Sequence, residues 1–300
     1  MNRNDVTWQG NFTAIVTPFK KDGAIDEAAF KKNIELLISE GIDGLVVTGC
    51  TGEFWALSDE ERTRLHRTAV DVAGGRVPVI AGTLAMLTDK VVELSKKAKA
   101  AGADGVMVTP PFYILPNESE IIEHYRRVSR EADIPILIYN IPKRVGVTTS
   151  PALLEKLCSI DNVVAVKQSS GSFDDVVETV RLCADKIRVF AGHSVTRGFP
   201  CVVMGTDGFV SSVETQILGR AAIDLYRLSA SGNVEAARKL QYRLVQLDHA
   251  VHGLGTFPSA LKAAMNLVGR PGGYPRSPIQ PLSAEDQERL RSVLQSIGVL

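Results

Sequence analysis

Residues 163–171 read Val163-Val164-Ala165-Val166-Lys167-Gln168-Ser169-Ser170-Gly171. The first four residues are apolar and three of them are β-branched, which predicts a short strand buried on both faces. The strand ends on a lysine. Burial lowers the pKa of an ammonium group, and the resulting neutral amine can attack a carbonyl carbon to form a Schiff base. The stretch therefore predicts either a nucleophilic Lys167 or a lysine that ends the strand and extends into solvent.

The composition is that of an ordinary soluble protein. Of 300 residues, 45% are hydrophobic and 23% are charged, which suits one large α/β domain or two small ones. The formal net charge is zero, so nothing attracts the chain generally to nucleic acid or to anionic lipid. No apolar run is long enough to span a bilayer, and Met1–Asp5 lacks the features of a secretory signal. We expect a cytoplasmic protein without membrane or nucleic-acid partners.

Neither the cysteines nor the histidines form a metal-binding pattern. The four cysteines are far apart and none belongs to a CxxC pair, so we expect reduced thiols. His249 and His252 are three residues apart, and a helix would place them on one face. No obvious third ligand stands beside them, so the sequence predicts no metal site.

Short apolar runs alternate with segments of helical period along the chain. Eight such runs predict strands, at residues 12–18, 44–49, 77–83, 105–110, 135–140, 163–167, 187–192 and 208–212. Each is followed by helix-like sequence within about 30 residues, the spacing of βαβ units. No GxGxxG follows the first strand. The pattern favours a closed (β/α)8 barrel of the α/β class over an open doubly wound sheet.

Local signals mark where elements begin and end. We expect Asp26 to cap a helix that ends at Gly41, and Ser58 with Glu61 to form a capping box at the next helix. A Gly-x-Asp-Gly joint recurs between a helix end and a strand, at residues 41–44, 102–105 and 205–208.

The C-terminal part of the chain is helical, with segments expected at residues 216–230, 233–250, 257–268 and 284–297. A (β/α)8 barrel does not require this many helices after its eighth strand. We expect residues 1–214 to hold the barrel strands and helices, and residues 215–300 to hold the last barrel helix and a C-terminal helical extension.

Polar residues of complementary chemistry follow three of the predicted strands. The loops at the carboxyl ends of the strands build the active site of a (β/α)8 barrel. Lys167 ends the sixth strand, Tyr139 lies at the end of the fifth, and Gly49-Cys50-Thr51-Gly52-Glu53 follows the second. A phenol can move protons while water leaves a carbinolamine, and a glycine-rich loop with a hydroxyl can hold a carboxylate. The alternatives are a packing role for Tyr139 and a plain tight turn for the loop.

These motifs carry a family resemblance. Gly49-Cys50-Thr51-Gly52-Glu53, Tyr139-Asn140-Ile141-Pro142 and Val164-Ala165-Val166-Lys167, in this order and at these separations, resemble the dihydrodipicolinate synthase / N-acetylneuraminate lyase family of class I aldolases. The resemblance implies a barrel with a C-terminal helical extension and a homotetramer. It implies a Schiff base with pyruvate or another 2-oxo acid, and no metal or organic cofactor.

Carried over to this chain, the resemblance implies a role for each matching residue. Lys167 would be the Schiff-base nucleophile and Tyr139 the acid and base that serves it. Thr51, with the loop amides that begin at Gly49, would bind the substrate carboxylate. Val210 would contact pyruvate through its backbone carbonyl.

The second-substrate half of the site is less clearly matched. Arg144 matches the arginine that receives the carboxylate of the second substrate in the synthases. Cys50 stands where they have a hydroxyl that relays protons to the tyrosine, and a thiol is a poorer hydrogen-bonding group. Tyr113 corresponds to a residue that reaches into the neighbouring subunit's site. His193 follows the seventh strand and could contact a hydroxyl of a polyol chain.

We therefore expect a class I aldolase-type lyase that acts on small 2-oxo acids and aldehydes. The leading activity is 4-hydroxy-tetrahydrodipicolinate synthesis from pyruvate and aspartate semialdehyde, which Arg144 favours. The alternative is an aldolase or dehydratase for a 2-oxo-3-deoxy sugar acid, which Cys50, Phe112 and His193 favour. A remote alternative is a non-catalytic pyruvate-binding protein, suggested by Cys50 alone.

Overall fold

The strands form one closed barrel. The computed structural model describes residues 1–300, and each strand runs parallel to its neighbours, with the eighth paired to the first. The strands are β1 (Gly10–Ala14), β2 (Gly44–Val47), β3 (Val79–Gly82), β4 (Gly105–Val108), β5 (Ile136–Asn140), β6 (Val163–Gln168), β7 (Arg188–Ala191) and β8 (Gly208–Ser211). The predicted α/β class and (β/α)8 barrel are confirmed.

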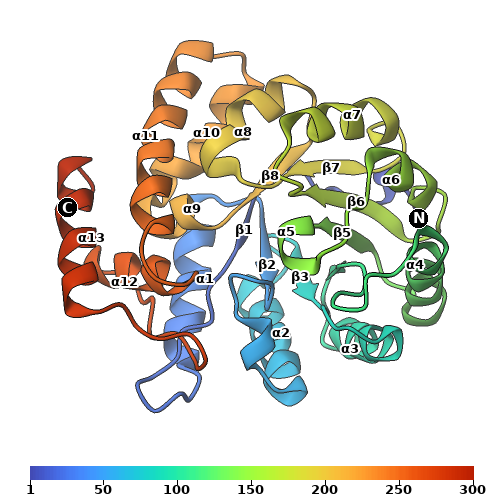
Figure 1. Cartoon of the computed structure of the whole chain (residues 1–300), viewed down its shortest axis with the longest axis horizontal. Helices are drawn as coiled ribbons and strands as arrows, with labels where there is room; N and C mark the ends of the chain where they lie inside the picture. Colours follow the sequence, from blue (N-terminus) through green and yellow to red (C-terminus); the bar gives the residue numbers. More distant parts are fainter.

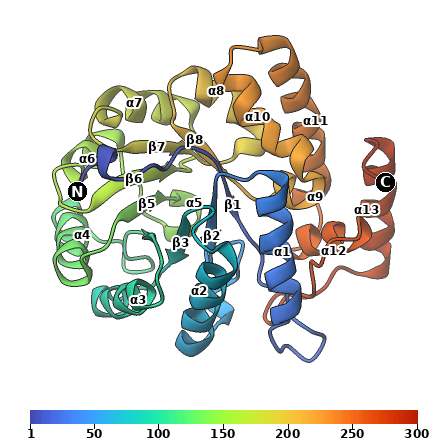
Figure 2. The ribbon, with the colours of Figure 1, turned by 180° about the vertical axis from the view of Figure 1, so that it is seen from behind.

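Helices surround the barrel and extend beyond it. They are α1 (Glu27–Glu40), α2 (Asp59–Ala73), α3 (Thr88–Ala100), α4 (Glu118–Ala132), α5 (Pro142–Val145), α6 (Pro151–Leu157), α7 (Phe173–Cys183), α8 (Ser194–Val203), α9 (Val213–Leu218), α10 (Arg220–Ala230), α11 (Val234–His252), α12 (Ser259–Leu267) and α13 (Ala284–Ser296), with short 3-10 turns η1 (Arg3–Asp5) and η2 (Phe54–Ala56). In both views, α12 and α13 lie outside the helical ring: α12 lies next to α9, and α13 is the outermost helix, next to α11 and α12 (Figures 1 and 2).

Alternation along the strands divides the core into an inner and an outer layer. The inward side chains fill the barrel, and they include Phe12, Val46, Ile80, Met107, Leu137, Val164, Phe190 and Val210. The outward side chains pack on the helices, as Leu45 and Val47 do in one cluster with Phe30 of α1 and Leu65 of α2. Because both faces of each strand are covered, the strands appear in the sequence as continuous apolar runs.

The expected helix caps are present. The Asp26 side chain accepts a hydrogen bond from the Ala29 N–H at the start of α1, and Gly41 ends this helix with φ of 95°. Ser58 and Glu61 form the capping box of α2. Local chemistry therefore sets these boundaries.

Two helical regions differ from the sequence prediction. The helix expected at 216–230 is two helices, because Gly219 between α9 and α10 has φ of 56°. α8, between β7 and β8, was not predicted, since Gly198 and Pro200 lower its helix propensity and Arg197 interrupts it with φ of −143°. None of the helices combines the length and the apolar character that crossing a bilayer would require.

Candidate active site

Lys167 and Tyr139 are neighbours inside the barrel. β5 and β6 pair with Tyr139 opposite Lys167. Lys167 Nζ lies 4.2 Å from the centroid of the Tyr139 ring. Only 7% of Lys167 and 4% of Tyr139 is exposed. The alternative in which Lys167 extends into solvent is therefore wrong.

Burial shifts the pKa values of both groups in directions that suit Schiff-base chemistry. It lowers the pKa of Lys167 to about 8, although the nearby Cys50 and Glu214 act in the opposite sense. About a tenth of the amine is then neutral at pH 7. Burial raises the pKa of Tyr139 well above its usual value, and Cys50 adds to this shift. The pair thus places a nucleophilic amine beside a protonated phenol.

The loop after β2, which carries Thr51, is held in one conformation. Thr48 and Glu53, at the two ends of the loop, have backbone φ angles of 54° and 55°. Residues other than glycine rarely adopt this left-handed conformation. Thr17 Oγ1 donates a hydrogen bond of 2.8 Å to the Gly52 carbonyl. A Cβ at Gly52 would lie 2.9 Å from the Thr48 Cα, so the close approach requires glycine. Thr51 is 5% exposed at the carboxyl end of the barrel.

A buried ion pair from the C-terminal region anchors the same loop. Lys262 of α12 binds Glu53, and their side chains are 1% and 0% exposed. Lys262 Nζ also donates to the carbonyls of Thr17 at 2.7 Å and Tyr274 at 2.8 Å. The Arg276 N–H donates to the second Glu53 oxygen at 3.0 Å. Every hydrogen-bonding group of this pair is thus satisfied without water.

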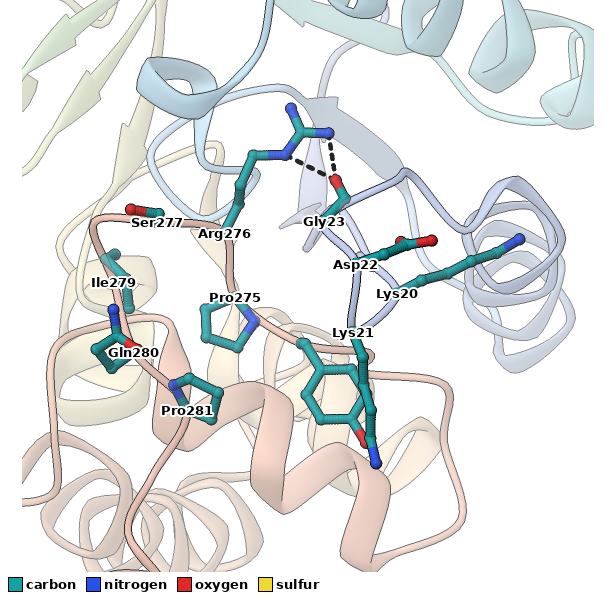
Figure 3. Close-up of a pocket in the computed structure, with 11 residues that line it drawn as sticks. Lys20, Lys21, Asp22, Gly23, Pro275, Arg276, Ser277, Ile279, Gln280 and Pro281 are labelled. Carbon is teal, nitrogen blue, oxygen red and sulfur yellow. Dashed lines mark hydrogen bonds between the residues drawn. The ribbon is translucent and has the colours of Figure 1, made fainter.

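Arg276 extends this anchor to the segment before α1. Its guanidinium donates twice to the Gly23 carbonyl, at 2.9 and 2.6 Å (Figure 3), and it forms two hydrogen bonds of 2.7 and 2.9 Å with Glu61. The two segments face each other across a surface groove (Figure 3), whose volume is about 760 Å³. None of the predicted site residues lines this groove.

A smaller cavity at the carboxyl ends of the strands brings most of the predicted site residues together. Its volume is about 110 Å³. The predicted residues that line it are Cys50, Thr51, Tyr139, Arg144, Lys167, His193 and Val210. We call it the lysine cavity.

The electrostatics of the lysine cavity favour an anionic ligand. Arg144, on α5, is exposed and forms no ion pair within the chain. Burial raises the pKa of the Cys50 thiol, so it stays protonated, although Arg144 and Lys167 act in the opposite sense. A carboxylate in the cavity would therefore meet the cations Lys167 and Arg144 and several hydroxyls, with Glu214 as the one acidic side chain in the wall.

Two predicted residues do not line the cavity. Gly49 begins the loop, and a Cβ there would come within 2.9 Å of the Met107 side chain. Tyr113 is 86% exposed, on the loop between β4 and α4, with φ of 75°. Ile114 and Leu115 beside it are 67% and 61% exposed.

One wall of the cavity was not predicted from the sequence. This wall includes Ser194, Glu214, His252 and Phe257. Glu214 is 1% exposed, accepts a hydrogen bond from Ser194 Oγ, and has a pKa raised by burial. The rings of His252 and Phe257 stack with centroids 5.4 Å apart. The position of Glu214 just after β8 was the signal that could have found it.

No group of three or more His, Cys, Asp or Glu side chains is arranged to hold a metal ion. The lysine cavity is lined by an amine, a phenol, hydroxyls and a guanidinium, together with a thiol, two imidazoles and one carboxylate. The amine and the guanidinium suit a carbonyl compound with a carboxylate.

Comparison with known proteins agrees with this geometry. Residues 7–297 match the Dihydrodipicolinate synthetase family. A relative from Methanothrix thermoacetophila, named 4-hydroxy-tetrahydrodipicolinate synthase, is 38% identical over 98% of this chain and 98% of its own length.

Solved structures share the fold along almost the whole chain. The dihydrodipicolinate synthase from Aquifex aeolicus superposes with a TM-score of 0.91 and 34% identity, covering 97% of this chain and 99% of its own. The chloride-inhibited dihydrodipicolinate synthase from Acinetobacter baumannii, complexed with pyruvate, gives a TM-score of 0.93 and 30% identity over 98% of this chain and 100% of its own.

Proposed function

This chain belongs to the dihydrodipicolinate synthetase family, and from that premise we propose that it makes 4-hydroxy-tetrahydrodipicolinate from pyruvate and aspartate semialdehyde. It is a class I aldolase-type lyase. The support is similarity along almost the whole chain to relatives named for this activity, together with the paired amine and phenol inside the barrel.

The first half of the reaction activates pyruvate. Lys167 attacks C2, and Tyr139 moves the protons that let water leave and the imine form. Loss of a C3 proton gives an enamine, with the protonated imine nitrogen as the electron sink, so this step requires no metal or organic cofactor. Thr51 and the amides of the loop that begins at Gly49 hold the carboxylate, and Val210 contacts pyruvate through its carbonyl.

The second half joins the two substrates. The enamine carbon adds to the aldehyde carbon of the semialdehyde, and the semialdehyde's amino group then displaces Lys167 from C2 and closes the ring. Arg144 binds the carboxylate of the semialdehyde, because its guanidinium lines the cavity without a partner. Cys50 stands beside Tyr139 in place of a hydroxyl, so the proton relay there passes through water.

The observation that carries this proposal is the contact between Lys167 Nζ and the Tyr139 ring, 4.2 Å apart in a cavity that also holds Arg144. Borohydride reduction with pyruvate, read by intact mass, tests the imine. We expect the mass of a reduced pyruvate adduct in the unmodified protein and no adduct in Lys167→Arg. A coupled assay compares aspartate semialdehyde with a panel of 2-oxo-3-deoxy acids. Efficient turnover of the semialdehyde is the expected result, and turnover of only the sugar acids would contradict the leading activity.

Arg144→Ala separates the two halves of the reaction. We expect it to abolish synthesis and to spare imine formation, because Arg144 serves only the second substrate. Lys143→Ala is the matched control, since Lys143 is the neighbouring exposed cation on the same short helix. Equal loss of imine and synthesis in Arg144→Ala would contradict the role assigned to Arg144.

One observation favours an aldolase or dehydratase for a 2-oxo-3-deoxy sugar acid as the second candidate. His193 and the buried Ser194 and Glu214 line the lysine cavity and offer hydrogen-bonding groups to a hydroxylated chain. The same panel of sugar acids tests this activity. Imine formation without turnover of any substrate would indicate the remote alternative, a pyruvate-binding protein.

Assembly and location belong to the same proposal. We propose a cytoplasmic homotetramer in which Tyr113, with the exposed Ile114 and Leu115, packs on a neighbouring subunit. Residues 215–300 supply the last barrel helix and a helical extension that anchors the Thr51 loop through Lys262. Light scattering coupled to gel filtration measures the mass of the assembly, and a stable monomer would contradict the proposed packing.

A further inference from the structure

A buried histidine of α2 contacts the first residue of the Thr51 loop, which comprises residues 48–53. Thr48 is 0% exposed, and its Oγ1 lies 2.6 Å from Nε2 of His66, which is 1% exposed. The same hydroxyl donates a hydrogen bond of 3.1 Å to the carbonyl of Gly82, the last residue of β3. The side chain of Thr48 thus ties the start of the loop to α2 and to β3.

These contacts assign one tautomer to His66. A threonine hydroxyl carries a single hydrogen, and Thr48 donates it to Gly82. Nε2 of His66 therefore carries a hydrogen and donates it to Thr48 Oγ1, while Nδ1 carries none. Nδ1 is buried without a partner, close enough to Arg62 for that positive charge to act on the ring. A nearby cation favours a bare nitrogen over an N–H group, in agreement with this tautomer.

The His66 ring stays neutral. Burial and the charge of Arg62 lower the pKa of His66 to about 3. Arg62 lies one helical turn earlier on α2 and is held by hydrogen bonds of 2.9 and 3.1 Å to the carbonyls of Gly82 and Leu84. The hydrogen bond from His66 to Thr48 is therefore independent of pH throughout the neutral range.

Thr48 needs such a partner because its backbone is strained. Its φ of 54° is left-handed, which makes a β-branched residue an outlier. Residues in strained conformations persist only where their surroundings hold them, and they concentrate at functional sites. β3 also packs closely here, since a Cβ at Gly82 would lie 2.4 Å from the Thr48 carbonyl oxygen. Cys50 and Thr51, two and three residues after this turn, line the lysine cavity, so the turn sets where Thr51 stands.

We propose that His66 is a positioning residue for the 2-oxo acid: its hydrogen bond to Thr48 keeps the Thr51 loop in the conformation that binds the carboxylate of pyruvate. The inference rests on the proposed function, which supplies the imine on Lys167 and the carboxylate-binding role of the loop. His66 does not line the lysine cavity. It therefore acts on the carboxylate only through the loop, and it does not act on the amine.

Two variants of His66 test this role. His66→Leu removes the N–H, but the Thr48 hydroxyl keeps the Gly82 carbonyl as its partner, and the unpartnered Nδ1 is removed as well. No new buried polar group loses its last hydrogen bond, so the variant is expected to fold. His66→Gln keeps an N–H donor in place of Nε2 and is the conservative variant.

The assay compares two ketones. Borohydride trapping is measured by intact mass at varied concentrations of pyruvate, and of acetone, which has the ketone without the carboxylate. In His66→Leu we expect the pyruvate concentration for half-maximal trapping to rise by about tenfold or more, as for the loss of a hydrogen bond to a charged group. The maximal trapping rate and the trapping of acetone are expected to stay unchanged, since Lys167 is not affected. His66→Gln is expected to behave like the unmodified protein.

His124→Leu is the matched control. His124 is also a buried histidine, 3% exposed, whose Nδ1 lies 2.9 Å from a threonine hydroxyl, Thr88 Oγ1, and whose Nε2 has no partner. His124 belongs to α4 and Thr88 to α3, so neither residue is part of the Thr51 loop. This control should leave the trapping of both ketones unchanged.

A variant of the loop itself tests the link through strain. Asparagine adopts the left-handed conformation more readily than threonine, so a loop with Thr48→Asn depends less on His66. His66→Leu should therefore weaken pyruvate binding less in the Thr48→Asn background than in the unmodified protein. An equal effect in both backgrounds would overturn the link through Thr48.

The remaining outcomes separate this inference from the proposed function. Equal losses with pyruvate and acetone in His66→Leu would overturn the positioning role, because a general disturbance of the fold affects both ketones. Normal pyruvate binding in His66→Leu, an equal shift in His124→Leu, or no recovery in His66→Gln would overturn it as well. Each of these results leaves the imine of the unmodified protein intact, whereas absence of that imine overturns the proposed function.

Discussion

Replacing Lys262 by methionine should destabilise the protein strongly and weaken pyruvate binding. Met is similar in length and fits an apolar site, so the change removes the charge and its hydrogen bonds with little loss of volume. Glu53 would then keep only the Arg276 N–H as a partner, at 3.0 Å, while its side chain stays 0% exposed. The carbonyls of Thr17 and Tyr274 would also each lose a hydrogen bond.

The expected magnitude follows from this burial. Removing one partner of a buried ion pair costs about 3–5 kcal/mol, because the other charge is left uncompensated. The loss concerns the Thr51 loop directly, since Glu53 ends that loop in a left-handed conformation with φ of 55°. Relaxation of the loop would move Thr51 away from the position that we propose for the substrate carboxylate, so we expect KM for pyruvate to rise more than kcat falls.

Urea unfolding at one fixed protein concentration measures the change in stability, and steady-state kinetics measure the change in KM. The matched control is Lys97→Met, which breaks a solvent-exposed pair with Glu93 on α3, where the side chains are 39% and 45% exposed. Water screens that pair, so the control should be far milder. A second mutation, Glu53→Gln in the Lys262→Met background, should restore part of the lost stability by removing the buried charge. A loss in Lys262→Met no larger than in Lys97→Met would refute the reasoning.

Three further predictions concern the chemistry of the lysine cavity. Because burial lowers the pKa of Lys167 to about 8 and the neutral amine is the nucleophile, the rate of imine trapping at fixed pyruvate should rise as the pH increases through about 8; a flat profile would contradict this. Tyr139→Phe keeps the ring beside Lys167 but removes the proton donor, so imine formation should slow by about a hundredfold to ten-thousandfold without loss of stability, as stopped-flow trapping and thermal melting would measure. Cys50→Ser places a hydroxyl beside Tyr139 and should raise the trapping rate, since a hydroxyl relays protons better than a thiol; an unchanged rate would show that Cys50 takes no part in the relay.

Much of the fold could be predicted because its signals are local. The continuous apolar runs give the eight strands, since barrel strands are covered on both faces. Asp26, Gly41, Ser58 and Glu61 mark helix ends through bonds that span only a few residues. The local signals failed at α8, where Gly198 and Pro200 lie inside a helix that tertiary packing stabilises.

The site was predicted only in part. The strand ends gave Lys167, Tyr139 and the Thr51 loop, because parallel strands bring their carboxyl ends to one face of the barrel. The wall formed by Glu214 and His252 was missed, since neither residue belongs to a motif. Glu214 stands just after β8, whereas His252 reaches the cavity only through the packing of α11.

The sequence by itself determined the number and order of the strands, the caps of several helices, and which side chains stand at the strand ends. Only the tertiary structure decided that Lys167 faces inward, that Glu53 pairs with Lys262 across 209 residues of chain, and that Glu214 and His252 line the lysine cavity. The physical reason is the range of the interactions. Backbone hydrogen bonds, capping and alternation act between near neighbours in sequence, whereas burial and charge pairing depend on which distant segments closure of the barrel brings together.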